Sequence, residues 1–89
     1  MIKNYRKTAT IQAEQFDGSA EMAKRYSIGY WRNTNDPMFR LKTLEGPMSL
    51  NIGDWIATGV KGEHWVIADD VFKASYVEVA EWTSIQKNI

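Results

Sequence analysis

The single histidine of the chain is the residue whose chemistry is easiest to define. Next to His64 stands Glu63, and Asp54, Asp69 and Asp70 are further carboxylates that a metal or proton-transfer site could use. None of them lies at a recognisable metal-ligand spacing from His64, and no serine sits in a nucleophile-elbow motif. Neighbouring residues of a strand also point to opposite faces, which separates Glu63 from His64. We therefore expect no catalytic residue, no metal site and no cofactor. A hydrolase that uses His64 and nearby carboxylates is the weakest of our three hypotheses.

Two further patterns have structural explanations that we prefer. Asp69 and Asp70 could form an acid pair for metal-assisted hydrolysis, but they begin a predicted helical turn, where carboxylates cap the helix or are solvated. The segment Gly59-Val60-Lys61-Gly62 matches the GxxG loop with which KH domains hold a nucleic-acid backbone. That loop joins two helices, whereas here it joins two predicted strands. We therefore do not expect nucleic acid as a partner.

Aromatic and basic side chains gather just before and within the first predicted hairpin. Tyr30 and Trp31 lie with Arg32 in the stretch Tyr30–Pro37, which is rich in Asn and Asp, and we predict it as a loop. A ring can stack on a base while cationic side chains hold its phosphate, or the cluster can be a protein hot spot. Loop aromatics also commonly cover an exposed core, and this alternative stays open. The predicted ligand-binding residues are Tyr30, Trp31, Arg32, Arg40, Lys42 and Trp55.

Charge is unevenly distributed along a chain whose net charge is zero. Residues 1–42 carry eight basic and four acidic groups, and residues 43–89 carry three basic and seven acidic groups. The two halves could complement each other within the fold or across a homo-oligomer interface. The alternative is a basic patch that faces an anionic ligand, formed by Lys3, Arg6, Lys7, Arg32, Arg40 and Lys42.

Composition restricts the class of protein. The chain has 89 residues, enough for one domain, and its 44% hydrophobic and 25% charged residues are those of an ordinary soluble protein. It has no cysteine, which excludes disulfides and thiolate zinc sites and fits a cytosolic protein. No apolar run approaches the roughly 20 residues that span a bilayer, so we expect no membrane partner. The basic N-terminus has no apolar segment behind it, so we do not expect a signal peptide.

Hydrophobic periodicity predicts an α+β fold. Thr8–Phe16 alternates as a half-buried strand, and Ala20–Ser27 reads as a helix with Ser19 as its N-cap. Two hairpins follow, with turns at Glu45-Gly46 and Lys61-Gly62. The four strands of these hairpins are predicted at 38–44, 48–52, 55–60 and 63–67. A last helical turn is predicted at 70–73 and a last strand at 75–79. The whole is a single domain, residues 1–89: a small antiparallel β-sheet or open barrel of five to six short strands with one N-terminal helix.

The alternation also predicts which side chains point inward. Phe39, Leu41 and Thr43 share the inward side of one strand, opposite Arg40 and Lys42. Further inward side chains are expected near the C-terminus, and residues 83–89 are expected to be a frayed tail. The inward side chains expected near the C-terminus are Val77, Val79 and Trp82. Trp55 and Trp65 lie on the two strands of the second hairpin, and we expect them to pair across it or to fill the core.

Three segments resemble a family of small bacteriophage and prophage proteins. They are the opening MIKNYRKTATIQAEQFDG, the middle LKTLEGPMSLNIGDWIATGVKGEHWVI and the ending DDVFKASYVEV. The resemblance leaves out mainly residues 19–37, and the chain departs from the family pattern at His64-Trp65 and at the Ala-Ser before Tyr76. The residues at the expected places are Gly53, Asp54, Trp55, Gly59, Gly62, Glu63, Phe72 and Tyr76. The resemblance implies an accessory protein that acts in the host bacterial cytoplasm.

Two hypotheses remain ahead of the hydrolase. The first is a homo-oligomeric, non-enzymatic phage protein that binds an anionic small molecule of the nucleotide type, sequestering a host immune signal as an anti-defence function. The anti-defence hypothesis is an analogy: the chain is similar in size and context to known anti-defence proteins. The alternative is a protein-interaction module that binds a host or phage protein, for which an exposed apolar patch is expected.

Overall fold

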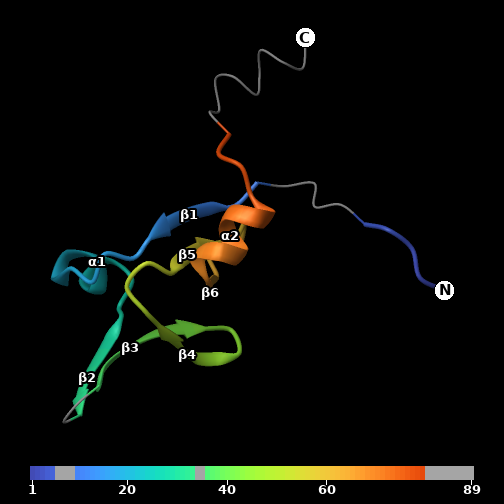
Figure 1. Cartoon of the computed structure of the whole chain (residues 1–89). Coiled ribbons are helices and arrows are strands. Elements are labelled where there is room, and N and C mark those ends of the chain that lie inside the picture. Colours follow the sequence, from blue (N-terminus) through green and yellow to red (C-terminus); the bar gives the residue numbers. More distant parts are fainter. Residues whose placement is uncertain (6–9, 34–35, 80–89) are drawn as a thin grey trace.

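The computed structural model describes residues 1–5, 10–33 and 36–79, and for residues 31–33 and 36–37 it describes the backbone alone. Figure 1 shows an α+β arrangement dominated by strands. Both helices are short, and among the described residues no helix is long and apolar enough to cross a membrane. In chain order the elements are β1 Gln12–Gln15, α1 Ala20–Arg25, β2 Gly29–Asn33, β3 Asp36–Thr43, β4 Gly46–Leu50, β5 Trp55–Thr58, β6 His64–Ile67 and α2 Asp69–Ser75.

The strands form two antiparallel sheets of three strands each, rather than the single sheet or open barrel that we predicted. Sheet A has the order β1-β5-β6, and sheet B has the order β2-β3-β4. The division falls at the turn Asn51–Asp54, which is closed by a bond from the Asp54 amide to the Asn51 carbonyl (3.0 Å). This turn carries the chain from β4 across to β5 in the other sheet, where β1 and β6 are its partners. Strands β3 and β4 contact β6, so the two sheets pack against each other.

The core lies between sheet B, α1 and one face of sheet A. Edge-to-face contact between the Phe16 and Phe39 rings, with centroids 4.9 Å apart, joins the two sheets. Helix α2 lies on the opposite face of sheet A, where Phe72 stacks on Trp55. Sheet A is therefore covered on both faces. The buried residues of the core cluster are Phe16, Met22, Ile28, Leu41, Leu50 and Ile56.

The first helix begins as predicted and ends earlier. The Ser19 hydroxyl accepts a hydrogen bond from the Met22 amide at 3.2 Å, which confirms the N-cap. The helix ends at Arg25, two residues before the predicted end. Ser27 adopts φ 55°, the left-handed conformation that commonly follows the end of a helix. Met22 is the buried residue of the helix and anchors it on the core.

Both predicted hairpins are present, although the turn residues of the first are Leu44 and Glu45 rather than Glu45-Gly46. In the first, β3 pairs with β4 and Gly46 adopts φ 103°, a conformation that favours glycine. The inward side of β3 carries Phe39 and the fully buried Leu41, as the alternation predicted. In the second hairpin the two tryptophans are not opposite each other, because Trp55 pairs with Ile67 and Ala57 pairs with Trp65. Neither Trp55 nor Trp65 is fully buried.

The prediction of a loop at Tyr30–Pro37 is wrong for most of that stretch. Strand β2 runs through Asn33 and β3 begins at Asp36, in a register that pairs Gly29 with Arg40 and Asn33 with Asp36. The Asn- and Asp-rich composition favours turns, but pairing with β3 supplies backbone hydrogen-bond partners to one edge of Gly29–Asn33. Residues 34–35 lie outside the described part of the chain.

The predicted last strand, Ser75–Val79, is also wrong. Helix α2 runs to Ser75, and Tyr76–Val79 has no regular structure. Helical spacing places Phe72 and Tyr76 on one face, and their rings stack at 5.2 Å. Val77 is 85% exposed instead of pointing inward, and Val79 is exposed as well. Thr8, Ala9, Trp82 and the tail 83–89 lie outside the described residues.

Truncation of Leu41 should destabilise the fold strongly. Leu41 is fully buried between the sheets, so Leu41→Ala removes apolar contacts and leaves a cavity. We expect a loss of about 2–5 kcal/mol in the free energy of unfolding, measured by urea denaturation. The matched control is Leu44→Ala, because Leu44 is 84% exposed at the tip of the same hairpin. Equal stability of the two variants would contradict the packing described here.

Candidate functional site

No described element covers the outward face of sheet B, and two cationic side chains of β3 lie on it. On β3, Arg40 and Lys42 alternate with the inward Phe39 and Leu41, and both are exposed. Arg40 pairs with Ser49 and Lys42 pairs with Pro47 in the register of β4. No carboxylate occurs among the described side chains of this face. We define the outward face of sheet B by its described, exposed residues, which are Met38, Arg40, Lys42, Pro47 and Ser49.

Of the predicted ligand-binding residues, the structure brings Arg40 and Lys42 together and places Tyr30 and Trp55 elsewhere. Tyr30 is opposite Phe39, with ring centroids 4.8 Å apart, so it extends the inward face; half of its surface is exposed. Trp55 belongs to sheet A and packs under α2. Trp31 and Arg32 occupy β2 positions that pair with Met38 and Pro37. Their side chains lie outside the described part of the structure.

Trp55 belongs to a stack of three rings that holds α2 on sheet A. Its ring lies 4.0 Å from that of Phe72, nearly parallel at 12°, and Phe72 stacks in turn on Tyr76. The indole Nε1 donates to Asp69 Oδ1 at 2.9 Å, and Lys73 Nζ lies 2.9 Å from Asp69 Oδ2. These two partners, Trp55 first, lower the pKa of the Asp69 carboxyl. Asp69 therefore does not cap the helix as predicted; the N-cap position is Ala68.

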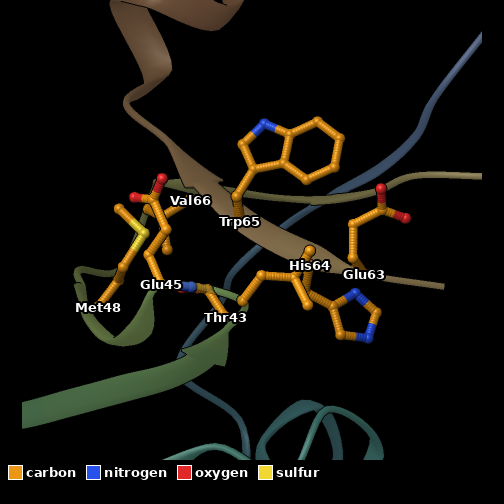
Figure 2. Close-up of a pocket in the computed structure, with 8 residues that line it drawn as sticks. Thr43, Glu45, Met48, Glu63, His64, Trp65 and Val66 are labelled. Atoms are coloured by element: carbon orange, nitrogen blue, oxygen red, sulfur yellow. The ribbon is translucent and has the colours of Figure 1, made fainter. Parts of the chain in front are cut away.

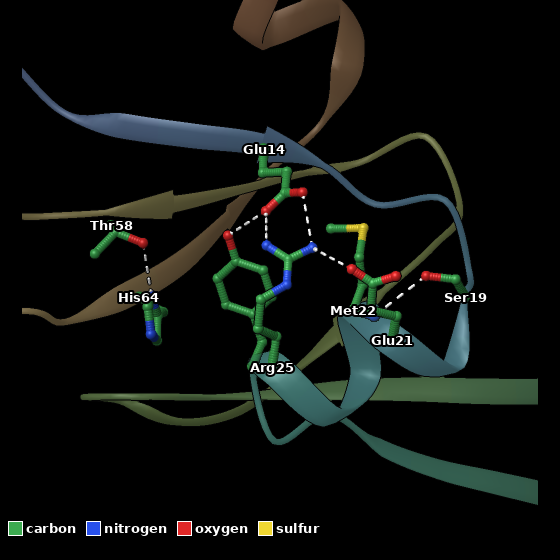
Figure 3. Close-up of polar contacts among 8 residues, drawn as sticks. Glu14, Ser19, Glu21, Met22, Arg25, Thr58 and His64 are labelled. Atoms are coloured by element: carbon green, nitrogen blue, oxygen red, sulfur yellow. Dashed lines mark hydrogen bonds and ion pairs between the residues drawn. The ribbon is translucent and has the colours of Figure 1, made fainter.

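A second polar cluster joins α1 to β1, as Figure 3 shows. The Glu14 carboxylate accepts two bonds from the Arg25 guanidinium, at 2.7 and 3.0 Å, and one from the Tyr26 hydroxyl at 2.7 Å. The bonds from Arg25 and then Tyr26 lower the pKa of Glu14. Burial, followed by the bond to Glu14, raises the pKa of Tyr26 to about 12. The sequence predicted none of these contacts.

His64 contacts Thr58 and Tyr26. Its Nδ1 is 2.9 Å from the Thr58 hydroxyl (Figure 3), and its ring meets that of Tyr26 edge-on at 5.3 Å. The Glu63 carboxylate accepts from the Lys61 amide at 2.9 Å and closes the GxxG turn. Glu63 and His64 point to opposite sides of the strand in Figure 2, as predicted. In the described residues no group of three or more His, Cys, Asp or Glu could hold a metal ion.

A groove of about 360 Å³ separates β6 from the tip of the β3–β4 hairpin (Figure 2). Its lining is largely apolar, and the two carboxylates that line it belong to Glu45 and Glu63. Sequence reasoning missed this groove because it arises where the edge strand of one sheet approaches the hairpin of the other. The lining residues are Thr43, Leu44, Glu45, Met48, Glu63, His64, Trp65 and Val66.

Comparisons of the chain with protein-family models, with curated proteins and with solved structures found no match. The resemblance to small phage proteins therefore stays a prediction from the sequence.

Alkaline titration should show that folding raises the pKa of Tyr26. The ordinary pKa of 10.0 applies to the unfolded chain and a pKa of about 12 to the folded protein, so folding favours the protonated phenol. The resulting stabilisation is fully present below pH 10 and is lost as the pH rises toward about 12. We expect the phenolate absorbance that distinguishes the wild type from Tyr26→Phe to develop well above pH 10.

The Glu14→Gln variant tests whether Glu14 contributes to the raised pKa of Tyr26. Glu14→Gln removes the charge that opposes the phenolate, so the Tyr26 pKa should fall toward 10.0. Glu21→Gln is the matched control, because Glu21 lies 4.0 Å from Arg25 and makes no bond to Tyr26. A Tyr26 titration that is the same in both variants would contradict the role given to Glu14.

Acid titration should weaken the attachment of α2. The Asp69 pKa lies below its ordinary value of 3.8, so the stability that its ionised form contributes is present above that pH and is lost as pH falls through the lower folded value. Asp69→Asn should lower the midpoint of thermal unfolding at neutral pH, and its difference from wild type should shrink in acid. Asp70→Asn serves as control, since Asp70 Oδ1 accepts from the adjacent Val71 amide. A pH-independent difference would overturn the assignment.

Proposed function

We propose that this protein is a non-enzymatic binding module that captures an anionic ligand of the nucleotide type on the outward face of sheet B. One observation carries the proposal: Arg40 and Lys42 are exposed, two residues apart, on a sheet face that no other described element covers. An anion that approaches this face meets two cations held by one strand.

The two cations are suited to different parts of a phosphate-bearing ligand. Arg40 offers a planar guanidinium that can bind phosphate oxygens in a bidentate manner, and Lys42 offers a compact ammonium. Residues two apart on a strand are separated by roughly 7 Å, so one nucleotide can reach both. Trp31, which pairs with Met38 in the register of β2, is the ring that we propose for stacking on the base.

Sequestration needs affinity and no bond chemistry. Within the predicted phage context, a small protein that binds a host nucleotide signal in the bacterial cytoplasm would lower its free concentration and blunt the immune response. The support for this context is the sequence pattern around Leu41–Trp65, and the support for the ligand class is the charge of the outward face.

Charge removal on the outward face should weaken binding. We expect isothermal titration against cyclic and ADP-ribose-derived nucleotides to identify a ligand whose affinity falls at least about tenfold in the double variant Arg40→Ala/Lys42→Ala, because bonds to charged groups contribute roughly 1.5–3 kcal/mol each. The matched control is Lys24→Ala/Lys61→Ala, which removes the same charge from exposed positions on α1 and on the β5–β6 turn.

The outcomes separate the proposal from its alternative. No heat of binding with any nucleotide, or equal affinity of the two double variants, would contradict the proposed function. Capture of one host or phage protein from infected cells, retained by Arg40→Ala/Lys42→Ala, would favour the protein-interaction module instead.

A further inference from the structure

The N-terminal arm, Met1–Tyr5, is apolar and basic, and the fold leaves it uncovered. Ile2 is 97% exposed and Tyr5 is 90% exposed, and Met1 is fully exposed as well. Figure 1 shows the arm leading away from the sheets. Lys3 lies within it, and no acidic residue occurs in the sequence before Glu14. Three large apolar side chains in water within five residues call for a partner surface.

The groove between β6 and the β3–β4 hairpin has the complementary properties. Leu44, Met48 and Trp65 give it apolar walls, and Glu45 and Glu63 give it negative charge. Neither lysine nor arginine is among the described residues that line it. Its volume of about 360 Å³ is in the range of sites that hold small molecules or a few side chains. An anionic ligand is therefore disfavoured here, and a basic, apolar segment is favoured.

We propose that this groove receives the N-terminal arm of a second copy of the chain. Ile2 and its apolar neighbours would lie against Met48 and Trp65, and Lys3 would approach Glu45. Each copy carries one arm and one groove, so exchange between two copies closes a symmetric pair and leaves no arm uncovered. The groove adjoins the inward face of sheet B, since Met48 pairs with Leu41 across β3 and β4. The dimer therefore leaves Arg40 and Lys42 accessible.

The first experiment tests charge complementarity by a charge swap. The dimer dissociation constant is measured by sedimentation equilibrium for the full chain. Glu45→Lys and Lys3→Glu should each raise it by about tenfold or more, and the combined variant should return it toward the wild-type value. Glu78→Lys is the matched control, because Glu78 is exposed and lies outside the groove. Failure of the combined variant to recover would overturn the pairing of Lys3 with Glu45.

The second experiment uses the absence of cysteine from the chain. Ile2→Cys protein is mixed with Met48→Cys protein under mild oxidation, and the same arm variant is mixed with Val71→Cys protein as control, since Val71 is exposed on α2. We expect cross-linked dimers mainly in the first mixture. A chain that stays monomeric at every concentration would overturn the proposal. So would an intrachain disulfide in monomeric Ile2→Cys/Met48→Cys protein, which would place the arm in its own groove.

Discussion

The fold depends on Phe16, the residue at which the chain leaves β1. Its amide donates to the Asp54 carbonyl at 2.8 Å, and its carbonyl accepts from the Gly53 amide at 2.9 Å. Its buried ring meets Phe39 edge-on. One residue thus fixes the turn between the two sheets and fills the space between them. A three-stranded sheet of such short strands needs a second layer for stability, and Phe16 helps each sheet to provide that layer for the other.

Local signals predicted the elements that local chemistry determines. The Ser19 cap, the turn at Gly46 and the alternation of Phe39 and Leu41 could all be identified from a few neighbouring residues. The division into two sheets could not, because it depends on the path that the chain takes after Asn51. The same applies to β2, where pairing with β3 prevailed over a turn-rich composition, and to α2, where stacking on Trp55 favours helical spacing.

The candidate sites also include features that one strand determines and features that depend on contacts between elements. Arg40 and Lys42 were placed correctly on the outward side of a strand, because alternation along one strand determines that position. Whether Tyr30 joins them depends on the register between β2 and β3, which assigns it to the face of Phe39. The groove beside β6 arises from contact between two sheets, and the bonds of Glu14 arise from contact between a helix and a strand. The spacing of residues along the sequence does not predict such contacts between distant elements.

The connectivity of sheet A also bears on the order in which the protein assembles during synthesis. Strands β2, β3 and β4 are consecutive, so their pairing needs only short connections, whereas the layer that stabilises sheet B is completed only after β5 and β6 are synthesised. Strand β1 is translated before them, yet its partner β5 follows after the whole of sheet B. The nascent chain therefore carries β1 as an unpaired segment until the second hairpin emerges, and α2, translated after the strands, covers the remaining face of sheet A.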